Sequence, residues 1–181
     1  LDPLQREAVE MALCNQTSIL TGGAGCGKAT TLRFIIGVME KLSKICRISG
    51  VEIALAAPTG MAAKRMKAAT GKETKKFTFQ MNDEEKAEVK REHMVLFDKV
   101  KQKCANEHID LLIFDEIIGA CNTGVFDQAA LVEFLKNKPK ELEVVMTGRN
   151  PALELVELAD YVSEVCMRKH PFKRGIPARV G

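Results

Sequence analysis

A glycine loop followed by a lysine is the first group of residues in this chain whose spacing could do chemistry. Gly22, Gly27 and Lys28 match the pattern G-x-x-x-x-G-K-[ST] within residues 18–31, SILTGGAGCGKATT. In this pattern backbone N–H groups surround phosphate oxygens, the lysine reaches the β- and γ-phosphates, and a hydroxyl at the last position binds Mg²⁺. Ala29 stands at that last position. The spacing therefore predicts phosphate binding with a weakened metal shell, and the open alternative is an ordinary glycine-rich turn.

The residues of this loop are the predicted nucleotide contacts. The helix that follows adds its positive amino-terminal end to an anion site. Thr30 offers a hydroxyl next to Ala29, but one helical step rotates it by about 100°, so it replaces the missing ligand poorly. The predicted nucleotide-binding set is Gly22, Gly23, Ala24, Gly25, Cys26, Gly27, Lys28, Ala29 and Thr30.

A pair of carboxylates follows the apolar segment 111–114, LLIF. Asp115, at the carboxyl end of a buried strand, is predicted to hold Mg²⁺, and Glu116 is predicted to orient or deprotonate a nucleophile. The alternative is a core strand that ends in two solvated acids. Because the glycine loop lies upstream, we predict that Lys28 and Asp115 follow adjacent or near-adjacent parallel strands and belong to one catalytic site.

Short apolar segments alternate with amphipathic ones, as in a parallel sheet covered by helices on both faces. This alternation predicts an α/β fold with a doubly wound parallel sheet and right-handed crossovers. The predicted strands are residues 17–21, 51–57, 109–114, 143–147 and 161–166, and the predicted helices include 28–44, 83–106 and 128–136.

Local signals predict the ends and faces of the helices. Asp127 is the predicted N-cap of the helix 128–136, and Asn150 and Pro151 are the predicted N-cap and first residue of the next helix. His93 is predicted to be a half-buried helix residue rather than a ligand. The predicted apolar stripe of the helix 83–106 consists of Val89, His93, Leu96, Val100 and Cys104.

Length and composition favour one nucleotide-binding domain over all 181 residues. A net charge of +3 does not by itself indicate a nucleic-acid partner. The six cysteines have no metal-ligand spacing and are typical of reduced thiols, which favours a cytoplasmic protein. No apolar segment reaches transmembrane length and no leader pattern is present, so we expect no membrane partner. Because the chain opens on Leu1, we expect it to be trimmed or processed.

Residues 1–74 resemble the first motor domain of RecD-type superfamily-1 helicases. The segments that carry the resemblance are LDPLQREAV, TGGAGCGKATT and ALAAPTGMAAKRM. The resemblance implies that Gln5 reads the adenine edge of a bound nucleotide. It also implies a single-stranded nucleic-acid contact after residue 57, where Lys64, Arg65 and Lys67 make a small basic face; the open alternative is a solvated helix surface.

Residues 75–181 instead resemble the corrinoid adenosyltransferases. The matching segments include KKFTFQ, IDLLIFDEI, VFDQAALVEFLKNKP, LEVVMTGRNPALELVELADYVSEV and RKHPFKRGIPARVG. The resemblance implies ATP, Mg²⁺ and a corrinoid substrate, a homodimer, and contact of Arg149 with phosphate oxygens, for which its forked guanidinium is suited. It places Phe77 and Phe79 near the corrinoid; the alternative for both is core packing. Both resemblances imply a P-loop NTPase (RecA-like) three-layer fold with a mostly parallel sheet.

Three functions fit these patterns. The leading hypothesis is transfer of the 5′-deoxyadenosyl group of ATP to a cobalt(I) corrinoid, with release of triphosphate. The second is an ATP-binding chimeric scaffold, natural or engineered, with little or no catalysis, as Ala29 and the mixed halves suggest. The third is a helicase-derived ATPase module that binds single-stranded nucleic acid. The chain has no Trp and one Tyr, so platforms for base stacking are scarce and a nucleic-acid partner is disfavoured.

Overall fold

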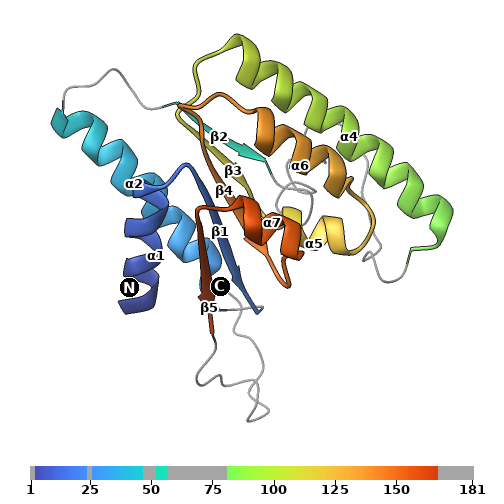
Figure 1. The fold of residues 1–181 in the computed structure, drawn as a ribbon, viewed down its shortest axis with the longest axis horizontal. Coiled ribbons are helices and arrows are strands. Elements are labelled where there is room, and N and C mark those ends of the chain that lie inside the picture. Colours follow the sequence, from blue (N-terminus) through green and yellow to red (C-terminus); the bar gives the residue numbers. More distant parts are fainter. Residues whose placement is uncertain (1–2, 24–25, 47–51, 57–80, 167–181) are drawn as a thin grey trace, which may run out of the picture.

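The computed structural model describes residues 3–23, 26–46, 52–56 and 81–166. Within them a parallel five-stranded sheet has the order β2-β3-β4-β1-β5 (Figure 1). This arrangement confirms the predicted α/β fold with a parallel sheet. The strands are β1 (Thr17–Gly22), β2 (Ile53–Ala56), β3 (Leu111–Phe114), β4 (Glu143–Gly148) and β5 (Tyr161–Val165).

Helices cover both faces of the sheet, which makes the three layers that the sequence predicts (Figure 1). Side chains alternate between the faces along each strand. On β3, Leu112 and Phe114 therefore pack with the later helices, whereas Leu111 and Ile113 pack with the first two. The first two helices are α1 (Pro3–Cys14) and α2 (Lys28–Cys46), and the later ones are α4 (Asp83–Asn106), α5 (Ile117–Asn122), α6 (Gln128–Asn137) and α7 (Leu153–Leu158).

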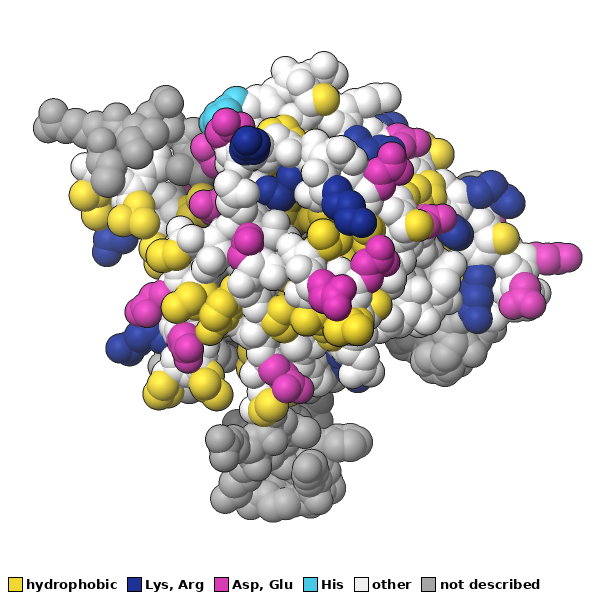
Figure 2. Space-filling view, in the orientation of Figure 1, with side chains coloured by type: hydrophobic (Ala, Val, Ile, Leu, Met, Phe, Trp, Pro, Cys, Tyr) yellow, Lys and Arg dark blue, Asp and Glu magenta, His cyan; other side chains and the backbone are white. Residues whose placement is uncertain are grey.

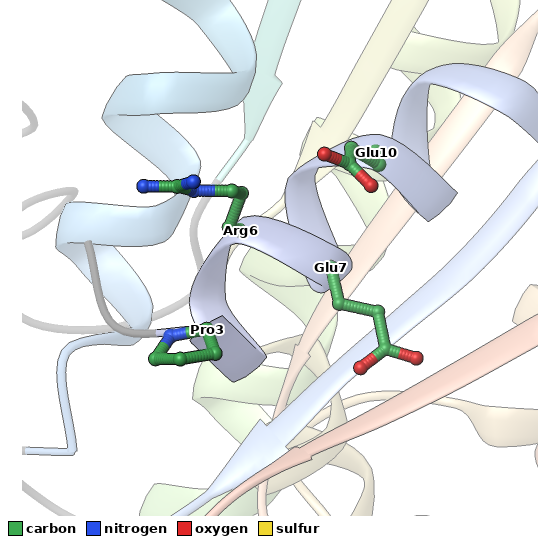
Figure 3. A pocket seen from close by; sticks show the side chains of 4 residues that line it. All are labelled: Pro3, Arg6, Glu7 and Glu10. Atoms are coloured by element: carbon green, nitrogen blue, oxygen red, sulfur yellow. The ribbon is translucent and has the colours of Figure 1, made fainter.

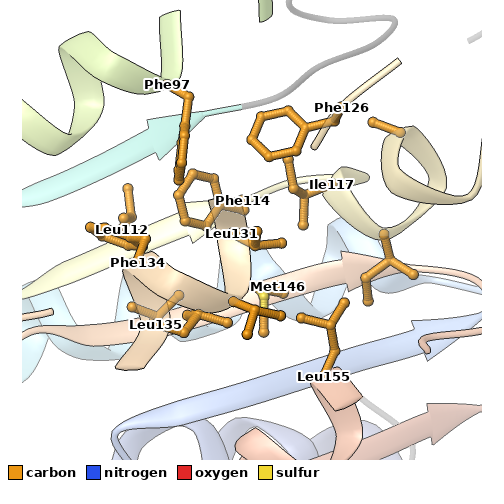
Figure 4. Close-up of a cluster of buried hydrophobic side chains, with 14 of the residues drawn as sticks. Phe97, Leu112, Phe114, Ile117, Phe126, Leu131, Phe134, Leu135, Met146 and Leu155 are labelled. Carbon is orange, nitrogen blue, oxygen red and sulfur yellow. The ribbon is translucent and has the colours of Figure 1, made fainter. Parts of the chain in front are cut away.

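Aromatic side chains form the centre of the core beneath α4 and α6 (Figure 4). The ring of Phe97 meets those of Phe126 and Phe134 edge-on, with centroids 5.1 and 5.6 Å apart. Phe114, from β3, completes the group at 6.0 Å from Phe97. These offset contacts suit aromatic rings and join α4 to the strand that precedes the carboxylate pair.

The face of α4 differs from the predicted stripe. Leu96 is 39% exposed, whereas its neighbour Phe97 is 2% exposed and takes the inward position. An apolar stripe of fixed spacing rotates around the axis of a helix of this length. Phe97 rather than Leu96 therefore faces the core, where its ring packs against other aromatic rings. His93 is buried rather than half-buried, with Nδ1 2.7 Å from the carbonyl oxygen of Val125. The bounds of α4 match the prediction, and Asn82 and Glu85 form a capping box at its start.

The start of α7 also differs from the prediction. Ala152 is its N-cap, so Asn150 and Pro151 lie outside the helix. Asn150 has φ +51°, a left-handed conformation that asparagine tolerates better than most residues. Its carbonyl oxygen accepts a hydrogen bond from Nδ2 of Asn122 at 3.1 Å. A loop anchored on α5 therefore replaces the predicted first turn.

Asp127 caps α6 as predicted, and its replacement by Ala is expected to destabilise the protein by about 1–2 kcal/mol. Its Oδ1 accepts from the backbone N–H groups of Ala129 at 3.0 Å and Ala130 at 3.3 Å. Removing the carboxylate leaves both donors unpaired. Urea unfolding of wild type and D127A at neutral pH measures the cost, and an unchanged midpoint would contradict the cap.

The same carboxylate makes this contribution pH-dependent. Lys90 donates to Asp127 across 3.0 Å, and this bond, with the capping N–H groups, lowers the pKa of Asp127 below its ordinary value. The stabilisation is therefore complete above the unfolded-state pKa and is lost as the pH falls through the lowered folded-state pKa. Asp127→Asn is the matched control, because it keeps the cap acceptor and loses the titration. An acid profile of D127N identical to that of wild type would show that the titration of Asp127 does not contribute to stability.

Candidate functional site

The candidate site lies at the edge of the sheet where β1, β3 and β4 end. Strand β4 lies between the other two, with Thr21 opposite Gly148 and Phe114 opposite Met146. The glycine loop follows β1 and the carboxylate pair follows β3, so parallel pairing brings both to one edge. Lys28 and Asp115 therefore follow near-adjacent strands, as the sequence predicts.

Lys28 is the first residue of α2 and is 7% exposed. Its ammonium donates to the carbonyl oxygens of Gly22 at 2.9 Å and Gly23 at 3.1 Å. The same Nζ lies 3.5 Å from Oε1 of Glu116. The loop, the lysine and the second carboxylate are thus in direct contact, and a buried positive charge lies beside the amino-terminal end of a helix.

Two glycines of the loop have backbone conformations and close contacts that a residue with a Cβ would disturb. Gly22 has φ +145°, and a Cβ there would lie 2.4 Å from the carbonyl oxygen of Val165. Gly27 has φ +88°, and a Cβ there would lie 2.5 Å from Nε2 of Gln5. The side chain of Gln5, carried by α1, therefore lies against the loop. Its predicted reading of adenine stays a prediction.

Asp115 and Glu116 both bond a residue that the sequence reasoning did not single out. Thr147, on β4, is fully buried. Its hydroxyl donates to Oδ1 of Asp115 at 2.8 Å and accepts from the backbone N–H of Glu116 at 2.7 Å. Glu116 itself has φ +60° and precedes α5. The only sequence signal for Thr147 is a hydroxyl residue at the end of a predicted strand.

Arg149 follows β4 directly and is exposed. Its backbone is fixed, because its carbonyl oxygen accepts from Nδ2 of Asn122 at 2.8 Å. Gly148 has φ +149°, and a Cβ there would lie 2.5 Å from Cβ of Ile118. The guanidinium forms no ion pair with another residue in the described ranges, so the predicted phosphate contact remains a prediction.

The two threonines that follow Ala29 differ in their surroundings. Thr30 is exposed on α2. Thr31 is buried, and its hydroxyl donates to the carbonyl oxygen of Gly27 at 3.1 Å. Cys26 is half-buried beside the loop. The predicted residues Ala24, Gly25, Phe77 and Phe79, and the side chain of Ala29, lie outside the described residues.

The donor set around the loop suits a metal ion that is bound together with phosphate. In the described part of the chain, no group of three or more His, Cys, Asp and Glu residues could hold a metal ion. Mg²⁺ is usually bound by one or two carboxylates, with substrate phosphates and water as its other ligands. Asp115, an oxygen ligand at the strand end, fits that mode.

A surface pocket elsewhere does not belong to this site. It is lined by four residues of α1 (Figure 3), namely Pro3, Arg6, Glu7 and Glu10. None of them is a predicted site residue. Glu7 instead accepts a hydrogen bond from the hydroxyl of Tyr161 at 3.1 Å, which joins α1 to β5. Within the described ranges, no helix has the length and apolarity needed to cross a membrane.

Comparison with solved structures supports the fold. The chain is similar to the Pif1 helicase from Candida albicans (TM-score 0.52, 19% identity, 92% of this chain and 39% of that one). It is also similar to the Hef helicase domain from Pyrococcus furiosus (TM-score 0.54, 12% identity, 96% and 40%). At such identities the likeness concerns the fold alone, and it agrees with the predicted P-loop NTPase architecture.

Comparison with curated proteins gives two kinds of relative. A corrinoid adenosyltransferase from Sinorhizobium sp is 41% identical over 86 residues, which are 47% of this chain and 40% of the relative. The RecD subunit of the RecBCD enzyme from Mycobacterium tuberculosis (strain ATCC 25618 / H37Rv) is 40% identical over 72 residues, which are 40% of this chain and 12% of the relative. The aligned parts thus span less than half of either relative.

A family model assigns most of the chain. The model described as ATP:corrinoid adenosyltransferase BtuR/CobO/CobP matches residues 42–181. The match begins before residue 75, where the resemblance read from the motifs starts, and it includes β2 through β5 with the carboxylate pair and Arg149. Because it covers well over half of the residues, this chain belongs to the ATP:corrinoid adenosyltransferase BtuR/CobO/CobP family.

Proposed function

We propose that this chain binds ATP and transfers its 5′-deoxyadenosyl group to a cobalt(I) corrinoid. The observation that carries the proposal is the contact of Lys28 with Glu116, 3.5 Å apart, beside the Asp115–Thr147 pair in a member of this family. A loop lysine next to strand-end carboxylates is the arrangement that triphosphate binding requires. ATP and the corrinoid are the substrates that the family implies, and their assignment to this chain is part of the proposal.

The proposed reaction is a substitution at carbon. The cobalt(I) atom of the corrinoid substrate donates an electron pair to the ribose C5′ of ATP. The cobalt–carbon bond forms, the C5′–O bond breaks, and the electrons of that bond leave with triphosphate. Cobalt is formally oxidised to cobalt(III), so the step needs no further oxidant. The chain's contribution is to hold the reactants in line and to stabilise the charge of the leaving triphosphate.

Lys28 and Arg149 are the proposed cationic contacts of the triphosphate. In the structure the ammonium of Lys28 is bonded to two loop carbonyl oxygens and lies near Glu116. These bonds hold the lysine at the loop before ATP binds. When ATP binds, phosphate oxygens would replace part of these contacts. The backbone carbonyl of Arg149 is held by Asn122, and among the described residues its guanidinium has no ion-pair partner, which leaves it available for the outer phosphates.

Asp115 is the proposed holder of Mg²⁺, and Glu116 is proposed to orient the groups around it. When bound, Mg²⁺ would neutralise part of the negative charge on the triphosphate. Loop N–H groups and the start of α2 would supply the rest of the anion site. Because Ala29 lacks the usual hydroxyl ligand, we propose that ATP binding depends on these groups more than on the metal.

A second candidate function is ATP binding without transfer. The observation that favours it is the similarity to RecD over 72 residues, in a chain that also carries Ala29. A nucleic-acid role has less support. On the face shown in Figure 2, acidic and basic side chains are interspersed, whereas nucleic-acid binding favours a basic stripe.

One experiment in two steps distinguishes these functions. The purified chain is titrated with ATP, with and without Mg²⁺, by isothermal calorimetry. Chemically reduced cobalamin is then added, and an absorbance scan follows formation of the cobalt–carbon bond. Binding with product supports the transferase. Binding without product supports the second candidate, and absence of binding overturns both.

Restoring the missing hydroxyl is expected to strengthen metal-dependent binding. The variant Ala29→Thr should raise ATP affinity in Mg²⁺ by about tenfold or more, the order of magnitude that support around a metal site contributes. Affinity without Mg²⁺ should not change, because the loop N–H groups and Lys28 are unaltered. Calorimetry in both conditions measures the difference. Ala105→Thr, an exposed change on α4, is the control. An equal gain with and without Mg²⁺ would contradict the metal explanation.

A further inference from the structure

We infer that Thr147 is the positioning residue that holds Asp115 and Glu116 ready for the metal–triphosphate group. The inference rests on the proposed nucleotide site and assigns a role to a residue that contacts neither phosphate nor corrinoid in that proposal. It arises from one hydroxyl on β4 that joins two consecutive residues after β3. Strands β3 and β4 are neighbours in the sheet (Figure 1).

The hydroxyl of Thr147 makes two hydrogen bonds, one through its proton and one through a lone pair of its oxygen. It donates to Oδ1 of Asp115 at 2.8 Å and accepts from the backbone N–H of Glu116 at 2.7 Å. Both distances are those of well-formed hydrogen bonds. The residue is 0% exposed, so bulk water does not compete for either bond. The hydroxyl therefore bonds the carboxylate of Asp115 and the backbone of Glu116.

The bond to Asp115 determines how its carboxylate is turned. A carboxylate has two oxygens, and a donor on Oδ1 fixes the rotation of the group about its last bond. The second oxygen then points in one direction instead of sampling several. Partners that hold a metal ligand in this way support metal affinity although they do not touch the ion. Because Ala29 has no hydroxyl that could bind the metal, the proposed metal site depends more strongly on the orientation of the Asp115 carboxylate.

The bond to Glu116 stabilises an uncommon backbone turn. Glu116 has φ +60°, which a residue other than glycine adopts only sparingly. Its N–H is satisfied by Thr147, and its carboxylate lies 3.5 Å from the ammonium of Lys28. Thr147 thus connects the proposed metal ligand to the counter-ion of the phosphate lysine.

Two substitutions separate the hydroxyl from the shape of the side chain. Thr147→Val keeps the branched shape and removes the hydroxyl, whereas Thr147→Ser keeps the hydroxyl. ATP affinity is measured by calorimetry without metal and with Mn²⁺, a probe that replaces Mg²⁺. We expect T147V to lose about 10–100-fold in Mn²⁺-dependent affinity and to keep the metal-free affinity. T147S should stay close to wild type.

The control variant is Thr123→Val. The hydroxyl of Thr123 also donates a hydrogen bond, in this case to the backbone carbonyl oxygen of Gly119 at 2.9 Å, but Thr123 is exposed and is the C-cap of α5. T123V should bind Mn²⁺–ATP as wild type does. If T147V also does so, or if T147S fails like T147V, the role of the hydroxyl is overturned. If wild type binds no ATP, the proposed function is overturned instead.

A measurement on the ligand-free wild-type protein tests the same geometry if T147V does not fold. The N–H of Glu116 should exchange slowly with solvent deuterium, because it is bonded to a buried hydroxyl. In T147S the protection should persist. Exchange of the Glu116 amide at the rate of an exposed loop amide would overturn the inference without reference to nucleotide.

Discussion

The variant Lys28→Met is expected to bind ATP about 100-fold more weakly than wild type, because a bond from a buried ammonium to a charged group contributes about 1.5–3 kcal/mol. Methionine has a similar length and cannot donate. The loss should be equal with and without Mg²⁺, since Lys28 would contact phosphate directly. Calorimetric titration measures it, and thermal unfolding without nucleotide checks that the variant is folded.

Lys136→Met is the matched control for this prediction. Lys136 is exposed in the last turn of α6, on the other side of the sheet from α2. The variant K136M removes one positive charge, as K28M does, and should leave ATP affinity unchanged. If K28M binds ATP as tightly as wild type, the glycine loop is not the nucleotide site. A parallel loss in both variants would mean that net charge, not the loop, governs binding.

The second large effect is expected for Gly148→Ala, which should destabilise the protein by about 3–5 kcal/mol through overpacking and backbone strain. The added Cβ would lie 2.5 Å from Cβ of Ile118 and 3.0 Å from the backbone nitrogen of Gly119. Gly148 also has φ +149°, which L-residues rarely adopt. A loss of this size should lower the melting temperature by roughly 10 °C in a chain of this length.

Gly37→Ala is the control for the backbone. Gly37 lies within α2, and an added Cβ there would meet no atom within 4 Å. Alanine is the better helix former, so this variant should be stabilised by about 1 kcal/mol. Calorimetric melting of both variants compares the two glycines directly. A Gly148→Ala variant that melts with wild type would show that β4 and α5 are not packed as described.

Local signals in the sequence predicted those features of the fold that depend on neighbours along the chain. Apolar segments between helical ones predicted all five strands, because strands covered on both faces must be apolar throughout. Asp127 was predictable as a cap because its oxygen reaches N–H groups two and three residues later. The proximity of Lys28 and the carboxylates followed from the rule that parallel strands end at one edge.

Features that depend on which strands are neighbours were not predictable. Thr147 can reach Asp115 only because β4 lies beside β3, and alternation of elements does not determine that order. Two helices, α1 and α5, were missing from the predicted set. The latter has six residues and begins after a left-handed Glu116, where no glycine signals a turn. Asn150 resembled a cap locally, but its backbone is held by Asn122 from another element.

The strand order also determines when the glycine loop can reach its native shape during synthesis. In the described sheet, strand β1 pairs with β4 and β5, and the partner of Thr17, Val144, lies far along the chain. A fragment of residues 1–74 would hold β1 and β2, which are not neighbours in the sheet. The described strands of such a fragment would offer β1 no native partner. The unpaired N–H and C=O groups of a strand edge can pair with another chain and so promote aggregation. Among the described residues of the helicase-like segment, no two strands pair with each other, so we expect the glycine loop to reach its native shape only after β4 and β5 have been synthesised.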